Sequence, residues 1–203
     1  YRAHAAFSHL TGWGSATVPD SVLVIDARAA SAGEYTGNAP ATLFFRPTAG
    51  RHTDEFFANP AIGEFWVGRR PSLSHVTAEL GVQVRDLSEL AKALAHPVTP
   101  VDGAQHPTQR TTPGNNDLAR EVSEMRLVKD AYEIGQMQIA VEATKRGFSD
   151  ITRVLPMIVG NPRGERIIEG AFASRARLEG NGVGYETIAA AGPHACILHW
   201  IKN

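Results

Sequence analysis

The stretch of sequence that decides the fold is YETIAAAGPHACILHWIKN, residues 185–203. Two short apolar runs, residues 187–190 and 196–198, lie on either side of a Gly-Pro turn signal. This pattern predicts two buried strands joined by a turn, with His199 at the end of the second strand. A histidine at a strand end is more often structural than catalytic, although such a position can also bring a titratable imidazole into a pocket.

The composition is that of an ordinary globular protein. The 203 residues are 43% hydrophobic and 20% charged, and this length allows one or two domains with a sizeable core. The 20 basic and 21 acidic residues nearly cancel, and no basic patch stands out, so we expect no nucleic-acid partner. The single cysteine, Cys196, cannot form a disulfide within the chain, which favours a reducing, cytoplasmic location. Its apolar surroundings predict a buried core residue.

Neither a membrane partner nor a targeting segment is expected. No apolar run approaches the ~18 residues that a membrane-spanning helix needs. The opening residues YRAH lack the basic segment followed by an apolar one that marks a signal peptide. The chain begins with Tyr1 rather than methionine, so we expect further residues to precede it.

The first part of the chain has an α/β pattern. Strands are expected at residues 21–26, 41–46 and 82–85, and helices at 72–80 and 87–95. Ser72 or Ser74 is the expected N-cap of the first of these helices, and Asp86 that of the second. Residues 64–68 are expected to form a short strand or a loop.

Residues 96–116 form the predicted linker, because they contain four prolines, two glycines and few apolar side chains. We therefore place a domain boundary near their end. The expected domains are a mixed-sheet α/β domain over residues 1–116 and a second domain over residues 117–203. A long loop inside a single domain is the alternative.

The second part of the chain is predicted to be helical. Asp130, with Glu133 three residues later, has the pattern of a capping box. The helix that follows is expected to extend to about Gly147, and a shorter helix is expected to start at Ser149 or Asp150. Further helices are expected at residues 117–128 and 165–178. Apolar residues at helical spacing predict a core-facing surface made of Ile134, Met137, Ala140, Val141, Thr144 and Phe148.

Three motifs resemble one known family. The terminal pattern Y-x-x-I-x-A-x-G-x-x-A-x-x-L-H-W-x-x-N closely resembles the signature of the aminopeptidase P, prolidase and creatinase family. Residues 124–134, EMRLVKDAYEI, resemble the start of that family's catalytic domain. Residues 64–70, EFWVGRR, resemble its N-terminal domain, and aminopeptidase P of bacteria more than prolidase. The resemblance spans nearly the whole chain.

The resemblance implies a proline-specific metallopeptidase whose α+β catalytic domain has the pita-bread fold. Such a hydrolase removes the first residue from peptides with proline in second position. By resemblance, His199 is the catalytic residue that contacts the substrate and helps to move a proton, and Tyr185 is a substrate-binding residue. The family usually has tyrosine after this histidine, where this chain has Trp200. His194 is expected to be a loop residue near the pocket.

The resemblance also implies two divalent metal ions, usually Mn²⁺, held by two aspartates, a histidine and two glutamates. In the family these ligands follow the terminal motif, so we expect no metal ligand within this chain, which ends at Asn203. We therefore expect the chain to be a truncated part of a longer enzyme, inactive alone and with apolar surface exposed in its last third. A homo-oligomer is also implied, with Arg69 or Arg70 at an interface.

The sequence alone leaves two alternatives open. Some pita-bread proteins lack the metal ligands and bind peptides or proteins, which makes a catalytically inactive binding module the first alternative. Creatinase-like hydrolysis of a small amidine without metal is the second, and residues 66–70 argue mildly against it. An Asp, Asp, His, Glu, Glu series after residue 203 would identify the metallopeptidase.

Overall fold

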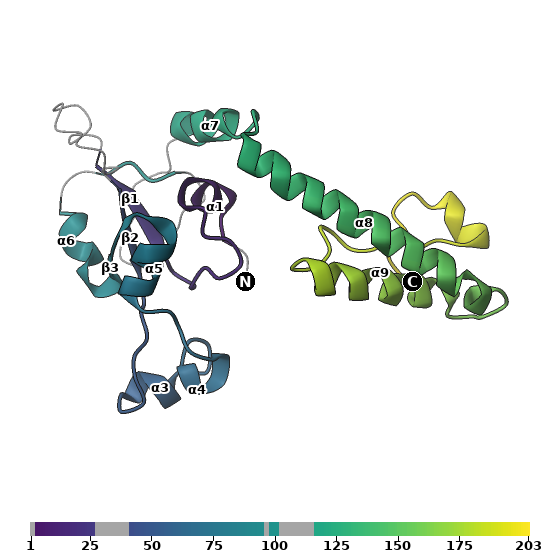
Figure 1. Cartoon of the computed structure of the whole chain (residues 1–203), viewed down its shortest axis with the longest axis horizontal. Helices are drawn as coiled ribbons and strands as arrows, with labels where there is room; N and C mark the ends of the chain where they lie inside the picture. Colours follow the sequence, from purple (N-terminus) through teal and green to yellow (C-terminus); the bar gives the residue numbers. More distant parts are fainter. Residues whose placement is uncertain (1–2, 27–40, 96–97, 102–115) are drawn as a thin grey trace. The chain divides into compact units, whose positions relative to one another are not determined.

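The computed structural model describes residues 3–26, 41–95, 98–101 and 116–203. The chain forms two compact units, Tyr1–Leu127 and Val128–Asn203, which are described separately (Figure 1). Most of the predicted linker, residues 96–116, lies outside the described residues. The domain boundary at residue 116 therefore stays a prediction.

The first unit contains a small mixed sheet. Its strands are β1 (Val22–Ile25), β2 (Ala41–Phe45) and β3 (Gln83–Asp86), in the order β1-β2-β3. β1 pairs antiparallel with β2, and β2 pairs parallel with β3, with Leu23 opposite Leu43 and Leu43 opposite Val84. The α/β class and all three strands expected in this part are confirmed.

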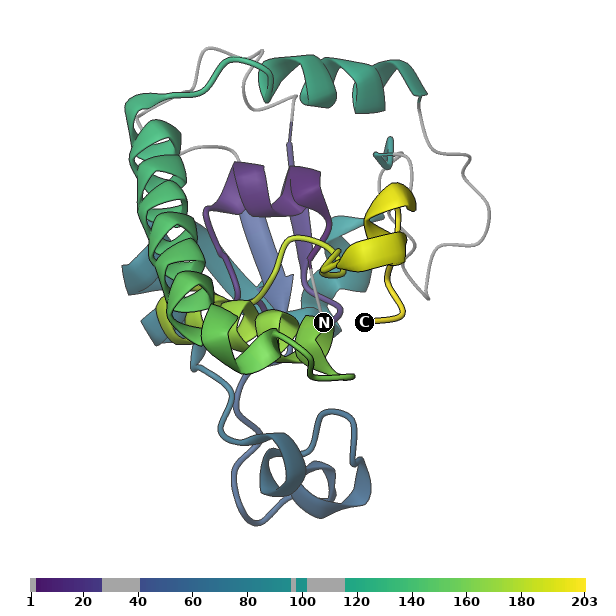
Figure 2. The same cartoon turned by 90° about the vertical axis from the view of Figure 1, so that its right-hand side faces the viewer.

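The largest core cluster of this unit lies on one face of the central strand β2, although Phe44 on the opposite face is buried too. Leu43 and Phe45 point to the same face because side chains alternate along a strand, and both are fully buried. They pack with Trp13, Val18 and Val76. The rings of Trp13 and Phe45 meet edge to face with centroids 5.2 Å apart. Figure 2 shows α1 (Ala5–Thr11), which precedes Trp13, lying across the strands.

Helices of the first unit largely match their sequence signals. They are α3 (Asp54–Ala58), α4 (Glu64–Val67), α5 (Leu73–Leu80), η1 (Leu87–Glu89), α6 (Leu90–Ala93) and α7 (Asn116–Met125). The Ser72 side chain caps α5 by accepting from the His75 N–H at 3.2 Å, and Asp86 caps η1 by accepting from Ser88 at 2.8 Å. Both expected caps are confirmed.

The expected strand or loop at residues 64–68 is wrong, because α4 occupies Glu64–Val67. A tight turn at Gly63 brings α4 against α3. A Cβ at Gly63 would lie only 2.6 Å from the Asn59 carbonyl oxygen. Only glycine tolerates this approach, and the turn lets the chain start a second helical turn beside the first.

The second unit is a pair of packed helices, α8 (Ala131–Ile158) and α9 (Gly164–Glu179), followed by the 3₁₀ helix η2 (Gly192–Cys196) (Figure 1). The predicted capping box is confirmed: Asp130 accepts from the Glu133 N–H at 2.8 Å, and Glu133 accepts from the Asp130 N–H at 3.0 Å. The predicted new helix at Ser149 or Asp150 is wrong, since α8 is continuous there. Asp150 lies inside this helix, and its side chain pairs with Arg175 of α9 at 2.6 Å instead of capping a helix start.

The two strands predicted at residues 187–190 and 196–198 are also wrong. Neither segment is a strand, and the described part of the second unit contains no strand at all. A strand needs a partner for its backbone hydrogen bonds, and these segments bond elsewhere: Ile197 N–H donates to the His194 carbonyl at 2.8 Å, and the Asn203 side chain bonds residues 187 and 189. Asn203 donates to the Thr187 carbonyl at 2.9 Å and accepts from the Ala189 N–H at 3.4 Å.

The predicted core-facing surface of α8 is exposed. Met137, Val141 and Phe148 are 55%, 63% and 61% exposed in the structure. Other large apolar side chains of the last third, such as Val159 and Leu178, are exposed as well. The expectation of exposed apolar surface in this part of the chain is therefore confirmed, and the core-facing role is not seen.

Candidate functional site

The terminal segment is held by one carboxylate, that of Glu165 in the first turn of α9. Glu165 Oε1 accepts from the backbone N–H of Ala191 at 2.7 Å and lies 2.9 Å from His194 Nδ1. Glu165 Oε2 accepts from the indole Nε1 of Trp200 at 3.0 Å. The Glu165 side chain is only 15% exposed. A single carboxylate therefore joins the start of η2, a side chain within η2 and a residue beyond it.

The hydrogen bonds fix the charge state of this carboxylate. The N–H of Ala191 contributes most to holding the pKa of Glu165 below its ordinary value, and the hydrogen bonds from His194 and Trp200 act in the same direction. Glu165 is therefore ionised at neutral pH and can only accept hydrogen bonds. An ionised carboxylate needs a donor at each contact, so we assign His194 Nδ1–H as the donor of the hydrogen bond to Glu165.

The two aromatic partners of Glu165 also contact each other. The rings of His194 and Trp200 stack with centroids 3.8 Å apart and planes 19° from parallel. His194, expected in a loop, lies in the 3₁₀ helix η2. One face of its imidazole stacks on Trp200, and its Nδ1 contacts Glu165. Figure 2 shows η2 (yellow) and the extended segments on either side of it.

The two predicted site residues lie on this same segment. His199 is exposed and directly precedes Trp200, and Tyr185 is 80% exposed. Among the described residues, neither side chain has a hydrogen bond or an ion pair. The structure places both on the segment that Glu165 anchors, and their roles toward a substrate stay predictions.

Two further expectations about single residues are corrected. Cys196, predicted to be a core residue, is exposed, because η2 replaces the buried strand that would have covered it. Of the two suggested interface residues, Arg70 is only 7% exposed and belongs to an internal network, whereas Arg69 is exposed and its interface role stays a prediction.

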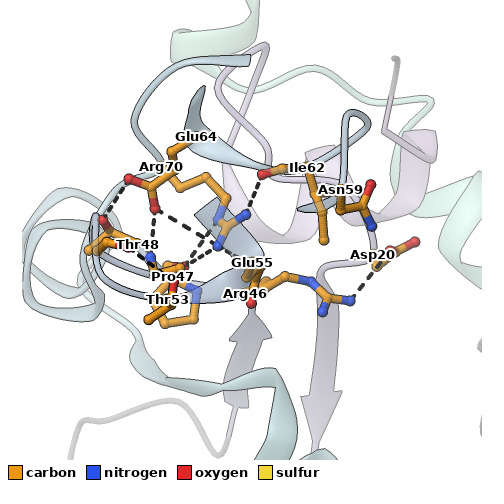
Figure 3. A network of polar contacts seen from close by, with 12 residues as sticks. Asp20, Arg46, Pro47, Thr48, Thr53, Glu55, Asn59, Ile62, Glu64 and Arg70 are labelled. Carbon is orange, nitrogen blue, oxygen red and sulfur yellow. Dashed lines mark hydrogen bonds and ion pairs between the residues drawn. The ribbon is translucent and has the colours of Figure 1, made fainter. Parts of the chain in front are cut away.

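The network around Arg70 ties the α3–α4 region to the end of β2 (Figure 3). Arg70 donates to the Pro47 carbonyl at 2.9 and 3.0 Å and to the Ile62 carbonyl, and pairs with Glu55 at 2.5 Å. The buried Glu64 accepts from the Ala49 N–H at 2.6 Å and from the Thr48 hydroxyl at 3.0 Å. Buried charges need such partners, so this network is structural.

An exposed aromatic patch lies on the same two helices. Its rings contact one another and belong to Phe56, Phe57, Phe65 and Trp66. All of these side chains except Phe56 are more than half exposed. The Trp66 indole donates to the Phe57 carbonyl at 2.9 Å, which keeps α4 against α3. Apolar patches of this kind mark contact surfaces in proteins.

No group of three or more His, Cys, Asp or Glu side chains suited to a metal ion occurs in the part of the chain that the structure describes. The described residues therefore do not fit a dinuclear metal centre. No helix among the described residues is long and apolar enough to cross a membrane.

Sequence reasoning missed Glu165. An acidic residue in the first turn of a helix is common because it interacts favourably with the helix dipole. Nothing in that local pattern links Glu165 to Ala191 or Trp200, which follow it by 26 and 35 residues. One signal was available: residues 187–203 contain His and Trp donors but no Asp or Glu. This pattern favours a carboxylate partner from elsewhere in the chain.

An α/β unit, a helical pair and a histidine-bearing terminal segment agree with the peptidase family that the motifs resemble. Over its full length the chain is 41% identical to Xaa-Pro aminopeptidase 1 of Streptomyces coelicolor and 37% identical to Xaa-Pro aminopeptidase 2 of the same organism. It is therefore a homologue of Xaa-Pro aminopeptidases along its whole length, as the motifs predicted. A probable Xaa-Pro aminopeptidase of Uncinocarpus reesii is 32% identical over 44% of this chain and 21% of its own length.

The chain spans 40% and 42% of the lengths of the two Streptomyces relatives. No protein-family model matches it. No solved structure gives a significant match either.

Proposed function

We propose that this chain is part of an Xaa-Pro aminopeptidase, which hydrolyses the bond between the first residue of a peptide and a proline in second position. The observation that supports this most is the match of all 203 residues to proteins of that name at 41% identity. The exposed histidine of the L-H-W motif is consistent with it, because a residue that meets a substrate must be accessible.

The chemistry of the target bond explains the role proposed for His199. An Xaa-Pro amide has no N–H, and the proline ring restricts its conformation, so the bond fits ordinary peptidase sites poorly. Its nitrogen must gain a proton in order to leave. An imidazole titrates near neutral pH and can supply or hold that proton, and this is the step that we assign to His199. Tyr185, on the same segment, is proposed to contact the peptide.

Several parts of the proposal rest on the resemblance. They are the pita-bread architecture, the requirement for divalent metal ions such as Mn²⁺, the cytoplasmic location and the homo-oligomeric state. The exposed patch around Phe65 and Trp66 supports self-association, since burying it would remove aromatic surface from water. No side-chain cluster among the described residues supports the metal requirement.

The first test is the intact mass of the natural protein that contains these residues, followed by a cleavage assay with that protein. We expect a mass well above 21.9 kDa. We also expect release of the first residue from an Xaa-Pro peptide, none from the matched Xaa-Ala peptide, and loss of activity with a chelator that Mn²⁺ restores. A protein that binds the Xaa-Pro peptide without cleaving it would instead be a binding module. Hydrolysis of creatine alone would indicate the creatinase-like alternative.

A further inference from the structure

We infer that Glu165 is a positioning residue, which fixes residues 191–200 and thereby holds His199 in place for the reaction proposed above. The inference rests on that proposed function for its catalytic part only. Its structural part, that one carboxylate sets the conformation of the terminal segment, rests on contacts within the second unit.

The contacts of Glu165 bracket His199 along the chain. Ala191 and His194 are bound on its N-terminal side, and Trp200 is bound immediately after it. Among the described residues, the His199 side chain has no hydrogen bond of its own, so its position depends on how its neighbours are fixed. Glu165 holds the Ala191 backbone and the Trp200 indole. The chain between them, which includes His199, therefore has little freedom.

The chemistry of the three donors requires a carboxylate. Three N–H groups converge on two oxygens, and an ionised carboxylate accepts at both oxygens and donates from neither. A glutamine in the same place keeps the shape but turns an NH₂ group toward one of the donors. Since Oε1 takes two of the three hydrogen bonds, the best placement of the glutamine oxygen is there, and the Trp200 indole then faces a donor.

A plain electrostatic role for Glu165 would predict something different. A carboxylate in the first turn of a helix stabilises the helix through its charge alone, wherever the side chain points. Glu169, one turn later on α9, lies beyond the turn in which this effect acts, so it is the control for losing a carboxylate from the same helix. It is half-buried, and among the described residues its side chain makes no hydrogen bond or ion pair. Glu169→Gln therefore removes a charge from the same helix without disturbing the terminal segment.

The experiment compares Glu165→Gln with Glu169→Gln in the full natural protein labelled with 5-fluorotryptophan. The fluorine resonance of Trp200 is assigned by its loss in Trp200→Phe. We expect Glu165→Gln to shift that resonance and to lower kcat for an Xaa-Pro peptide on the order of 10²-fold, because a small misplacement of a reacting group has effects of this size. KM should change much less, and Glu169→Gln should match the wild type in both readouts.

The outcomes separate the two proposals. A Glu165→Gln variant with wild-type kcat, or one whose Trp200 resonance does not move, would overturn the positioning role. If that variant does not fold by circular dichroism, Trp200→Phe decides, since it removes the indole donor to Glu165 and keeps an aromatic ring beside His194: wild-type kcat there would equally overturn the role. A wild-type protein that cleaves no Xaa-Pro peptide would overturn the proposed function, and the Trp200 resonance would still test whether Glu165 fixes the segment.

Discussion

At the scale of single residues, His199 is the side chain on which the proposed chemistry depends. An acid or base that moves a proton in the transition state contributes roughly 10²- to 10⁴-fold to the rate. We therefore expect His199→Ala in the full natural protein to lower kcat by about that factor. His52→Ala is the matched control, because His52 is exposed on a loop of the first unit. Near-normal turnover of Xaa-Pro peptides by His199→Ala would remove the assignment.

Glu165 gives a second prediction at this scale, on pH. Its folded-state pKa lies below its ordinary value, chiefly because of the Ala191 N–H, so the unfolded chain binds its proton more readily. The stability that Glu165 contributes is therefore complete above the ordinary glutamate pKa and is lost as the pH falls through the lower, folded-state value. Urea unfolding should show Glu165→Gln less stable than the wild type at pH 7, with the difference shrinking in acid. A difference independent of pH would contradict this.

At the scale of elements, the packing of α8 on α9 is tight at one glycine and open at another. A Cβ at Gly147 would lie 2.9 Å from the Phe172 ring, whereas a Cβ at Gly135 would meet nothing within 4 Å. Alanine in place of glycine within a helix gains about 1 kcal/mol, and overpacking costs about 1–3 kcal/mol. Gly135→Ala should therefore raise the free energy of unfolding by about 1 kcal/mol. Gly147→Ala should lower it by up to about 2 kcal/mol, the difference between the two terms. Urea titration of both variants measures this, and equal effects would contradict the close contact.

The elements also show which features the sequence could predict. The capping box of Asp130 and Glu133 and the Ser72 and Asp86 caps are complete within four residues, so local pattern was sufficient for them. The three strands of the first unit were also predictable, because the apolar runs of β1 and β2 and the alternating pattern around β3 find partners in the same sheet.

The errors arise where a distant residue decides the local structure. Asp150 looks like a helix start, but Arg175 binds it and α8 continues through it. Residues 187–190 have the composition of a strand, but no strand of the described second unit pairs with them, and Asn203 bonds their backbone. For the candidate site, the motif predicted the segment, residues 185–203. The residue that holds this segment, Glu165, could not be found from local spacing.

At the scale of the whole molecule, the feature that remains is the exposed apolar side of α8. Ile134, Met137 and Val141 follow each other at helical spacing and are 47%, 55% and 63% exposed. A contiguous apolar surface of this kind favours association in water. We expect residues 1–203 expressed alone to bind the dye ANS and to form soluble aggregates by light scattering. More than half of the length of the Streptomyces relatives lies outside the region that matches this chain. If corresponding residues cover α8 in the full natural protein, that protein should bind less dye.

Substitution on that surface provides the control. Met137→Glu combined with Val141→Lys replaces two exposed apolar side chains with charges and leaves the Gly147–Phe172 contact untouched. In the 203-residue chain this double variant should reduce both dye binding and aggregation. In the full protein it should instead destabilise folding, because burying charged side chains costs desolvation even when the two charges, four residues apart on one helix, pair with each other. A monomeric 203-residue chain whose α8 amides are fully protected from hydrogen exchange would show that this surface is stable in water without further cover.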